Sequence, residues 1–253
     1  ARRRKWSMKI HARDQEIDRD GVQFTGGIAA EATTNLVRNP RAAVDVSGWA
    51  NNQPATVSRD TTVGRTGGES FKVITTGSGS NQGIGSLFNV QQHLAAQGQT
   101  FTTSMYAKGT GNVRILLVER SVTNTSLTTL YTPTTIALTN DWQRLTWTTT
   151  IAHADAYHMT IALVTDGAQA VTFWVTDIQL EEKPYATTYC DGSLGAGHAW
   201  TGTPHASSST RAYNDGLRTG RELIAELWAS WQNDTAETFR DIDYDADPVQ
   251  RTV

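Results

Sequence analysis

Apolar and polar side chains alternate along several stretches in the middle of the chain. Between residues 100 and 107, Phe101 and Met105 would lie on one side of an extended strand, and Thr102 and Tyr106 on the other. Glycine, asparagine and aspartate residues, which favour turns, separate such stretches at near-regular intervals. The pattern predicts strands over residues 70–76, 84–90, 100–107, 113–120, 127–138, 143–151, 157–165 and 171–182.

This run of short strands predicts a mainly β fold. Antiparallel sheets that each bury one face must pack against one another, which gives a β-sandwich. The composition agrees, because the 253 residues include 38 threonines, which favour strands, and 21 glycines. We expect four regions: a basic N-terminal arm at 1–34, the sandwich at 35–190, a strap rich in Gly, Ser and Thr at 191–216, and an acidic C-terminal helix and tail at 217–253.

The two ends of the chain carry opposite charge, although the net charge is only −3. Residues 1–13 hold six basic side chains and no acid, whereas residues 222–253 hold eight acids and two arginines. Such ends are either solvated extensions or segments that dock on neighbours in an assembly.

Apolar side chains recur at helical spacing over residues 219–242, which predicts an amphipathic helix. We expect this helix either to pack on the sandwich or to lie in an interface, with a partner protein or within a homotrimer. Periodicity alone does not distinguish between these arrangements. The residues expected to make assembly contacts are Arg2, Arg3, Arg4, Lys5, Leu227, Trp228 and Trp231.

The sequence lacks the patterns that mark common chemistry. Its single cysteine, Cys190, allows no internal disulfide framework, and no apolar run is long enough to cross a membrane. We find no nucleophile elbow or phosphate-binding loop, so we do not expect an enzyme. Nucleic-acid binding would rest on the basic head alone and is not expected. Two weaker candidates are a glycosidase pair among Glu69, Glu119, Asp141 and Asp155, and a metal site at His153, Asp155 and His158.

Several ordered motifs resemble a known family. Asn35-Leu-Val-Arg-Asn-Pro40 followed by Ser47-Gly48-Trp49 is similar to the opening of jelly-roll carbohydrate-binding modules of the family-4/9 type. Residues 102–109, 140–144 and 175–181 resemble later strands of that group, in the same order. The version found in minor tail proteins of bacteriophages infecting actinobacteria is more similar still, because there the module runs into segments like those at 185–189, 191–192 and 200–207.

The resemblance implies a jelly-roll in a structural protein of the phage particle, assembled in the bacterial host cytoplasm. Its expected partners are other virion proteins, further copies of itself and a glycan of the host surface. The alternative is a purely structural virion protein, such as a head decoration protein with protein contacts only, and a cell-wall glycan hydrolase ranks last. The family often places an aromatic–Glu pair after its Asn-Pro, where the Glu helps to hold a structural calcium. Here Arg41-Ala42-Ala43 stand instead, which leaves Asp177 as a candidate calcium ligand.

Sugar binding calls for aromatic faces beside amides and charged groups. Tyr106 alternates with threonine and serine on one predicted strand, and Trp174 alternates with threonines on another, so both could line an open sheet face. Arg114 and Gln179 are the expected polar neighbours. The alternative is that both aromatic residues only cover the sandwich.

Overall fold

The computed structural model describes residues 32–212, except 66–67, 88–89, 92 and 196, together with two short strands near the N-terminus. The chain divides into two compact units. In the first, residues 1–32 and 212–253, the described part is the antiparallel pair β1 (Ile17–Arg19) and β2 (Val22–Phe24). The second unit is Thr33–Arg211. The expected C-terminal helix and all seven expected assembly contacts lie outside the described residues.

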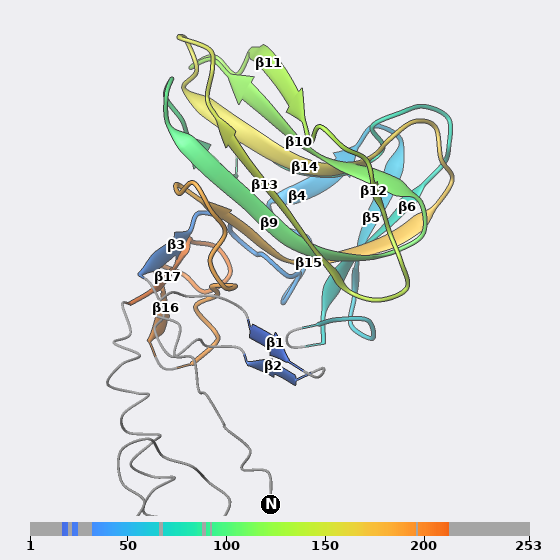
Figure 1. Ribbon diagram of the computed structural model, residues 1–253, viewed down its shortest axis with the longest axis horizontal. Coiled ribbons are helices and arrows are strands. Elements are labelled where there is room, and N and C mark those ends of the chain that lie inside the picture. The colour runs from blue at the N-terminus through green and yellow to red at the C-terminus, as the bar shows by residue number, and fades with distance from the viewer. Residues whose placement is uncertain are drawn as a thin grey trace, which may run out of the picture. The chain divides into compact units, whose positions relative to one another are not determined.

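Two antiparallel sheets form the body of the Thr33–Arg211 unit (Figure 1). One sheet has the order β13-β9-β15-β6-β5. The other follows the path β11-β10-β14-β7-β4, with β12 paired to β10 and β8 paired to β14. The five-stranded sheet consists of β5 (Ala55–Asp60), β6 (Ser70–Thr75), β9 (Thr100–Gly109), β13 (Gln143–Thr150) and β15 (Thr172–Glu181). The seven-stranded sheet consists of β4 (Trp49–Asn52), β7 (Gly83–Ser86), β8 (His93–Leu94), β10 (Asn112–Arg120), β11 (Ser126–Tyr131), β12 (Ile136–Ala137) and β14 (His158–Thr165).

The prediction of a β-sandwich is confirmed, and its strand order fits a jelly-roll. Each of the eight predicted stretches contains a strand, although 127–138 holds two, β11 and β12, separated by a segment that includes Pro133. Proline cannot donate a ladder hydrogen bond, which accounts for a break there. None of the described residues forms a helix long and apolar enough to cross a membrane.

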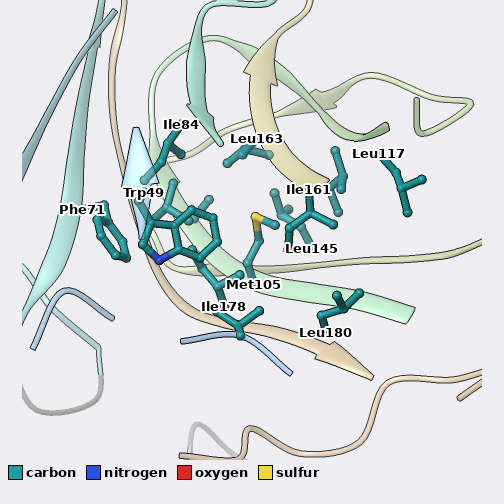
Figure 2. Packing of buried hydrophobic residues seen from close by; sticks show 14 of the residues in the cluster. Trp49, Phe71, Ile84, Met105, Leu117, Leu145, Ile161, Leu163, Ile178 and Leu180 are labelled. Atoms are coloured by element: carbon teal, nitrogen blue, oxygen red, sulfur yellow. The ribbon is translucent and has the colours of Figure 1, made fainter. Parts of the chain in front are cut away.

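The core lies between the inner faces of the two sheets (Figure 2). Met105 and Leu145, which are cross-strand partners in the five-stranded sheet, are both buried in it. Ile161 and Leu163 reach the same core from β14. Trp49 packs against Phe71, with 5.5 Å between ring centroids, and closes one part of the core.

A third sheet of three short strands joins the two ends of this unit. It has the order β16-β17-β3 and consists of β3 (Thr33–Asn35), β16 (His198–Trp200) and β17 (Ser209–Arg211). The strap expected at 191–216 therefore enters the same compact unit as the sandwich, up to Arg211.

The outer face of the five-stranded sheet is covered over part of its area. The segment after β15 crosses it, since Thr102 donates a hydrogen bond of 2.8 Å to the carbonyl of Lys183. As a result Thr102, Ser104 and Tyr106 are buried on the face opposite the core. The expectation that this side of β9 lies open is wrong, because a segment distant in sequence covers it.

Candidate functional site

The four residues expected to bind sugar do not form one site. Tyr106, Trp174 and Gln179 project from the outer face of the five-stranded sheet, whereas Arg114 belongs to β10 of the other sheet. Only Trp174 of the four lies half-buried at an uncovered part of the five-stranded sheet.

Tyr106 is 5% exposed and lies between two guanidinium groups. The Arg65 guanidinium carbon is 3.6 Å from the centre of its ring, and that of Arg144 is 5.9 Å away. The ring is thus already in contact with cations of the chain itself. Tyr106 offers no open face for a sugar in this structure.

Gln179 is wholly buried and acts as a link between β15 and the following segment. Its Nε2 donates to Glu181 at 2.7 Å, and its Oε1 accepts from the Cys190 amide at 2.6 Å. A buried amide with both ends engaged stabilises the fold and does not face solvent. The placement of Gln179 on an open face is therefore corrected.

Arg114 forms an ion pair with Asp166 and lies over the Tyr131 ring at 5.3 Å. A hydrogen bond from Thr135, followed by one from Arg114, lowers the pKa of Asp166. This group lies on the seven-stranded sheet and is separate from Trp174.

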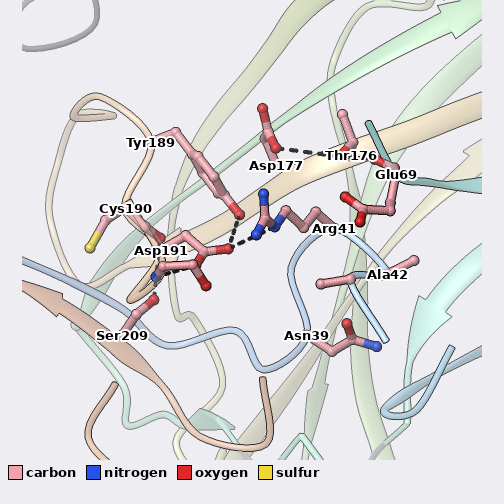
Figure 3. A network of polar contacts seen from close by, with 12 residues as sticks. Asn39, Arg41, Ala42, Glu69, Thr176, Asp177, Tyr189, Cys190, Asp191 and Ser209 are labelled. Atoms are coloured by element: carbon pink, nitrogen blue, oxygen red, sulfur yellow. Dashed lines mark hydrogen bonds and ion pairs between the residues drawn. The ribbon is translucent and has the colours of Figure 1, made fainter. Parts of the chain in front are cut away.

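Asp177 is placed by a β-bulge, where the register between β15 and β9 shifts after Thr176. Its φ of 52° lies in the left-handed region, and its buried carboxylate contacts Arg65 Nη1 at 3.0 Å. Nearby, buried Asp191 contacts Arg41 Nε at 3.3 Å and accepts a hydrogen bond of 2.9 Å from Tyr189 (Figure 3). Burial, together with these two aspartates, raises the pKa of Tyr189.

These contacts bear directly on the expected calcium. Arginine cations already face both Asp177 and Asp191. Within the described ranges, no three His, Cys, Asp or Glu side chains gather in a way that could hold a metal ion. The residues present do not fit a calcium site at Asp177.

The weaker candidates for chemistry are also engaged elsewhere. Buried Glu119 accepts the backbone amides of Ala152 and His153 at 2.8 and 2.9 Å, which fixes a loop. His153 accepts the Asp155 amide at 3.1 Å, whereas His158 is buried with its ring edge-on to Tyr157. Among the described residues no three such side chains gather as a metal site, and Glu119 is already engaged by the loop amides.

A groove of about 830 Å³ follows the free edge of β13, which pairs only with β9 in its sheet. Thr132, Pro133, Thr134 and Ile136 lie along one side, and Pro184, Tyr185 and Ala186 along another. The remaining lining comes from β13 and its neighbour: Thr102, Gln143, Arg144, Leu145, Thr146, Trp147 and Thr148.

The groove combines aromatic rings with hydroxyl and amide groups and includes no carboxylate. Tyr185 is 47% exposed, and Trp147 is half-buried against the core. Thr132 Oγ1 is buried and makes no hydrogen bond with the residues that the structure describes. The sequence patterns do not reveal this groove, since only the folded chain brings 132–136 and 184–186 to the edge of β13.

No protein-family model matches the chain, and no curated protein matches it. Among solved structures, the chain is similar to the enzymatically active domain of tailspike protein 4 of bacteriophage CBA120. That match has 15% identity and a TM-score of 0.47, and it covers 58% of this chain and 21% of the other.

Two carbohydrate-binding domains are similar to a comparable degree. The CBM22-1 xylan-binding domain from Paenibacillus barcinonensis Xyn10C has 14% identity and a TM-score of 0.48, with 62% of this chain and 100% of that one covered. A family 16 carbohydrate binding module has 21% identity and a TM-score of 0.42, with 58% and 99% covered. Because the TM-scores are below 0.5, no function follows from these similarities, and the sandwich stands on its own strand pairing.

Proposed function

We propose that this chain is a structural protein of a phage particle, of the minor-tail or tail-tip type, whose sandwich binds glycan on the host surface. The virion part of the proposal is supported by the ordered motifs that resemble actinobacteriophage tail proteins. The glycan part is supported by the groove along β13.

The chemistry of the groove suits a sugar chain. Tyr185 and Trp147 supply ring faces that pack against the apolar faces of sugars. Gln143, Thr146 and Thr148 supply amide and hydroxyl groups for sugar hydroxyls. A long, open groove at a strand edge admits an extended polymer.

We infer binding rather than catalysis at this groove. Hydrolysis of a glycosidic bond generally needs two carboxyl groups beside the scissile bond. The groove lining contains none, and the carboxylate of Glu69 lies 3.6 Å from Arg59. Incubation of host cell walls with the full chain is expected to release no reducing sugar.

The test is binding of the full chain to purified actinobacterial cell walls, with the variants Tyr185→Ala and Tyr157→Ala. Tyr157→Ala is the matched control for Tyr185→Ala. The two side chains are similarly exposed, at 49% and 47%, but only Tyr185 lines the groove. Loss of one stacking ring is expected to weaken binding of Tyr185→Ala by about fivefold to tenfold. Tyr157→Ala should bind as the wild type does, and equal binding by both variants would remove the groove as the site.

One observation favours the purely structural alternative. Leu94 and Val122 are 63% and 66% exposed, and they lie near exposed Tyr157 at one end of β14. The Tyr157 amide donates to the Arg120 carbonyl at 2.9 Å, which brings the β10–β11 turn to this place. An exposed apolar group of this kind suits a protein contact. Failure of the wild-type chain to bind any wall preparation would favour this alternative.

A further inference from the structure

A second surface of the five-stranded sheet carries lysines and tryptophans in alternation. On β15, Trp174 is paired with Lys72 of β6 on one side and with Lys108 of β9 on the other. Trp142 directly precedes β13 and contacts the same Lys108. We call these four residues, Lys72, Trp174, Lys108 and Trp142, the Lys–Trp row.

Each tryptophan of the Lys–Trp row lies near one ammonium group. Lys72 Nζ is 5.8 Å from the centre of the Trp174 ring, and Lys108 Nζ is 5.6 Å from that of Trp142. All four side chains are half-buried. Neighbouring strands are about 4.8 Å apart, so the two lysines are anchored about 10 Å from each other.

The positive charge of the Lys–Trp row is not neutralised within the described part of the chain. No hydrogen bond or ion pair joins either ammonium group to a residue that the structure describes, whereas Arg65, Arg41 and Arg114 all face carboxylates. The surface therefore presents two cations beside two flat rings.

Asp60, an acid beside this surface, is engaged with Trp174 and Thr62. Asp60 Oδ2 accepts the Trp174 indole N–H at 2.9 Å, and Asp60 Oδ1 accepts the amide and hydroxyl of Thr62. That indole hydrogen bond is the largest cause that lowers the pKa of Asp60 to about 2. Asp60 fixes the orientation of the Trp174 ring.

We propose that the Lys–Trp row binds an acidic glycan, a polymer whose sugars carry carboxylate groups. The rings pack against sugar faces while Lys72 and Lys108 contact the carboxylates. None of the four residues lines the β13 groove, so this site is distinct from the one in the proposed function. A nucleic acid is the less suitable polyanion, because residues 33–211 hold 11 basic and 11 acidic side chains and thus no general basic excess.

The experiment compares binding of the full chain to polygalacturonate and to its methyl ester, which has the same backbone without the charge. The test variant is Lys72→Gln with Lys108→Gln. The matched control is Arg38→Gln with Arg120→Gln, which removes the same charge away from the five-stranded sheet. Affinity electrophoresis at low and high salt reports binding, and circular dichroism reports folding.

We expect the wild type to bind polygalacturonate more tightly than the methyl ester, and high salt to weaken this preference. The Lys72/Lys108 variant should lose about tenfold in affinity for polygalacturonate, and the Arg38/Arg120 variant should not. Equal binding of the two polymers, an equal loss in both variants, or equally tight binding of single-stranded DNA would overturn the proposal. Each of these results leaves the Tyr185 test of the β13 groove unaffected.

Discussion

Single side chains hold distant parts of this sandwich together. Asn35 Nδ2 donates to the carbonyls of Ile178 and Cys190, both at 3.0 Å. Its Oδ1 accepts the amides of Val37 and Leu180, both at 3.1 Å. The sequence marks Asn35 only as the start of a motif. Three of these four partners lie more than 140 residues away, so no local pattern could reveal this role.

The same limit explains the outcome at the candidate site residues. The period of two on β9 and β15 places Tyr106 and Trp174 on the face opposite the core, as predicted. Whether such a face is open depends on what crosses it. The segment after β15 contacts Thr102, and the guanidinium groups of Arg65 and Arg144 lie over Tyr106, whereas Trp174 stays half-buried. No pattern within the strands encodes these contacts.

His93 makes the stability of the protein depend on acid. Burial, and then the nearby charge of Arg38, lower the pKa of His93 from 6.5 to about 4. Below pH 6.5 His93 becomes protonated in the unfolded chain but stays neutral in the folded chain. The free energy of unfolding therefore falls as the pH drops towards 4. The loss attributable to His93 is about 3 kcal/mol.

The check is urea unfolding of the wild type and of His93→Gln between pH 7 and about pH 4. The variant should show a shallower decline over this range, whatever its stability at neutral pH. Burial also lowers the pKa of His158, so a smaller decline of the same sign remains in the variant. Identical slopes for the two proteins would contradict the assignment to His93.

At the scale of elements, the long strands were predictable and the short ones were not. β9, β10, β13, β14 and β15 each have eight or more residues and carry regular alternation or continuous apolar runs. β16 and β17 have three residues each and lie in a segment rich in Gly, Ser and Thr. They form because β17 pairs with both β16 and β3, with Ser209 and Arg211 buried. This tertiary pairing overrides the weak local preference of the segment for strand structure.

We expect the folding unit to extend beyond residue 190 to Arg211. Ser209 Oγ donates to the Cys190 carbonyl at 3.2 Å, and Arg211 Nη1 donates to that of Thr188 at 3.3 Å. A fragment of residues 33–190 lacks β16 and β17, so it loses these two hydrogen bonds and the pairing of β17 with β3. We expect it to melt at least 5 °C below a fragment of residues 33–211, roughly the effect of 1 kcal/mol or more. Equal melting temperatures in differential scanning calorimetry would place the boundary at 190.

At the scale of the whole molecule, charge is concentrated outside the sandwich. Residues 33–211 carry equal numbers of basic and acidic side chains, 11 of each. In contrast, residues 1–13 hold six basic side chains and no acid, and residues 222–253 hold eight acids and two arginines. A neutral body with oppositely charged ends favours contact between the head of one copy and the tail of another, because like ends repel. The proposed virion role gives such contacts a purpose, since a tail protein must join a larger assembly.

This arrangement predicts that the full chain self-associates and that the 33–211 fragment does not. Exposed charges are screened beyond about 10 Å at 0.1 M salt, so the association should weaken steadily as salt rises. Sedimentation velocity of both proteins across a salt series measures this. Replacement of Arg2, Arg3, Arg4 and Lys5 by glutamine should weaken self-association at low salt to the level that the wild type shows at high salt. Association that persists in high salt would instead point to the apolar residues Leu227, Trp228 and Trp231, which the sequence offers as the other means of contact.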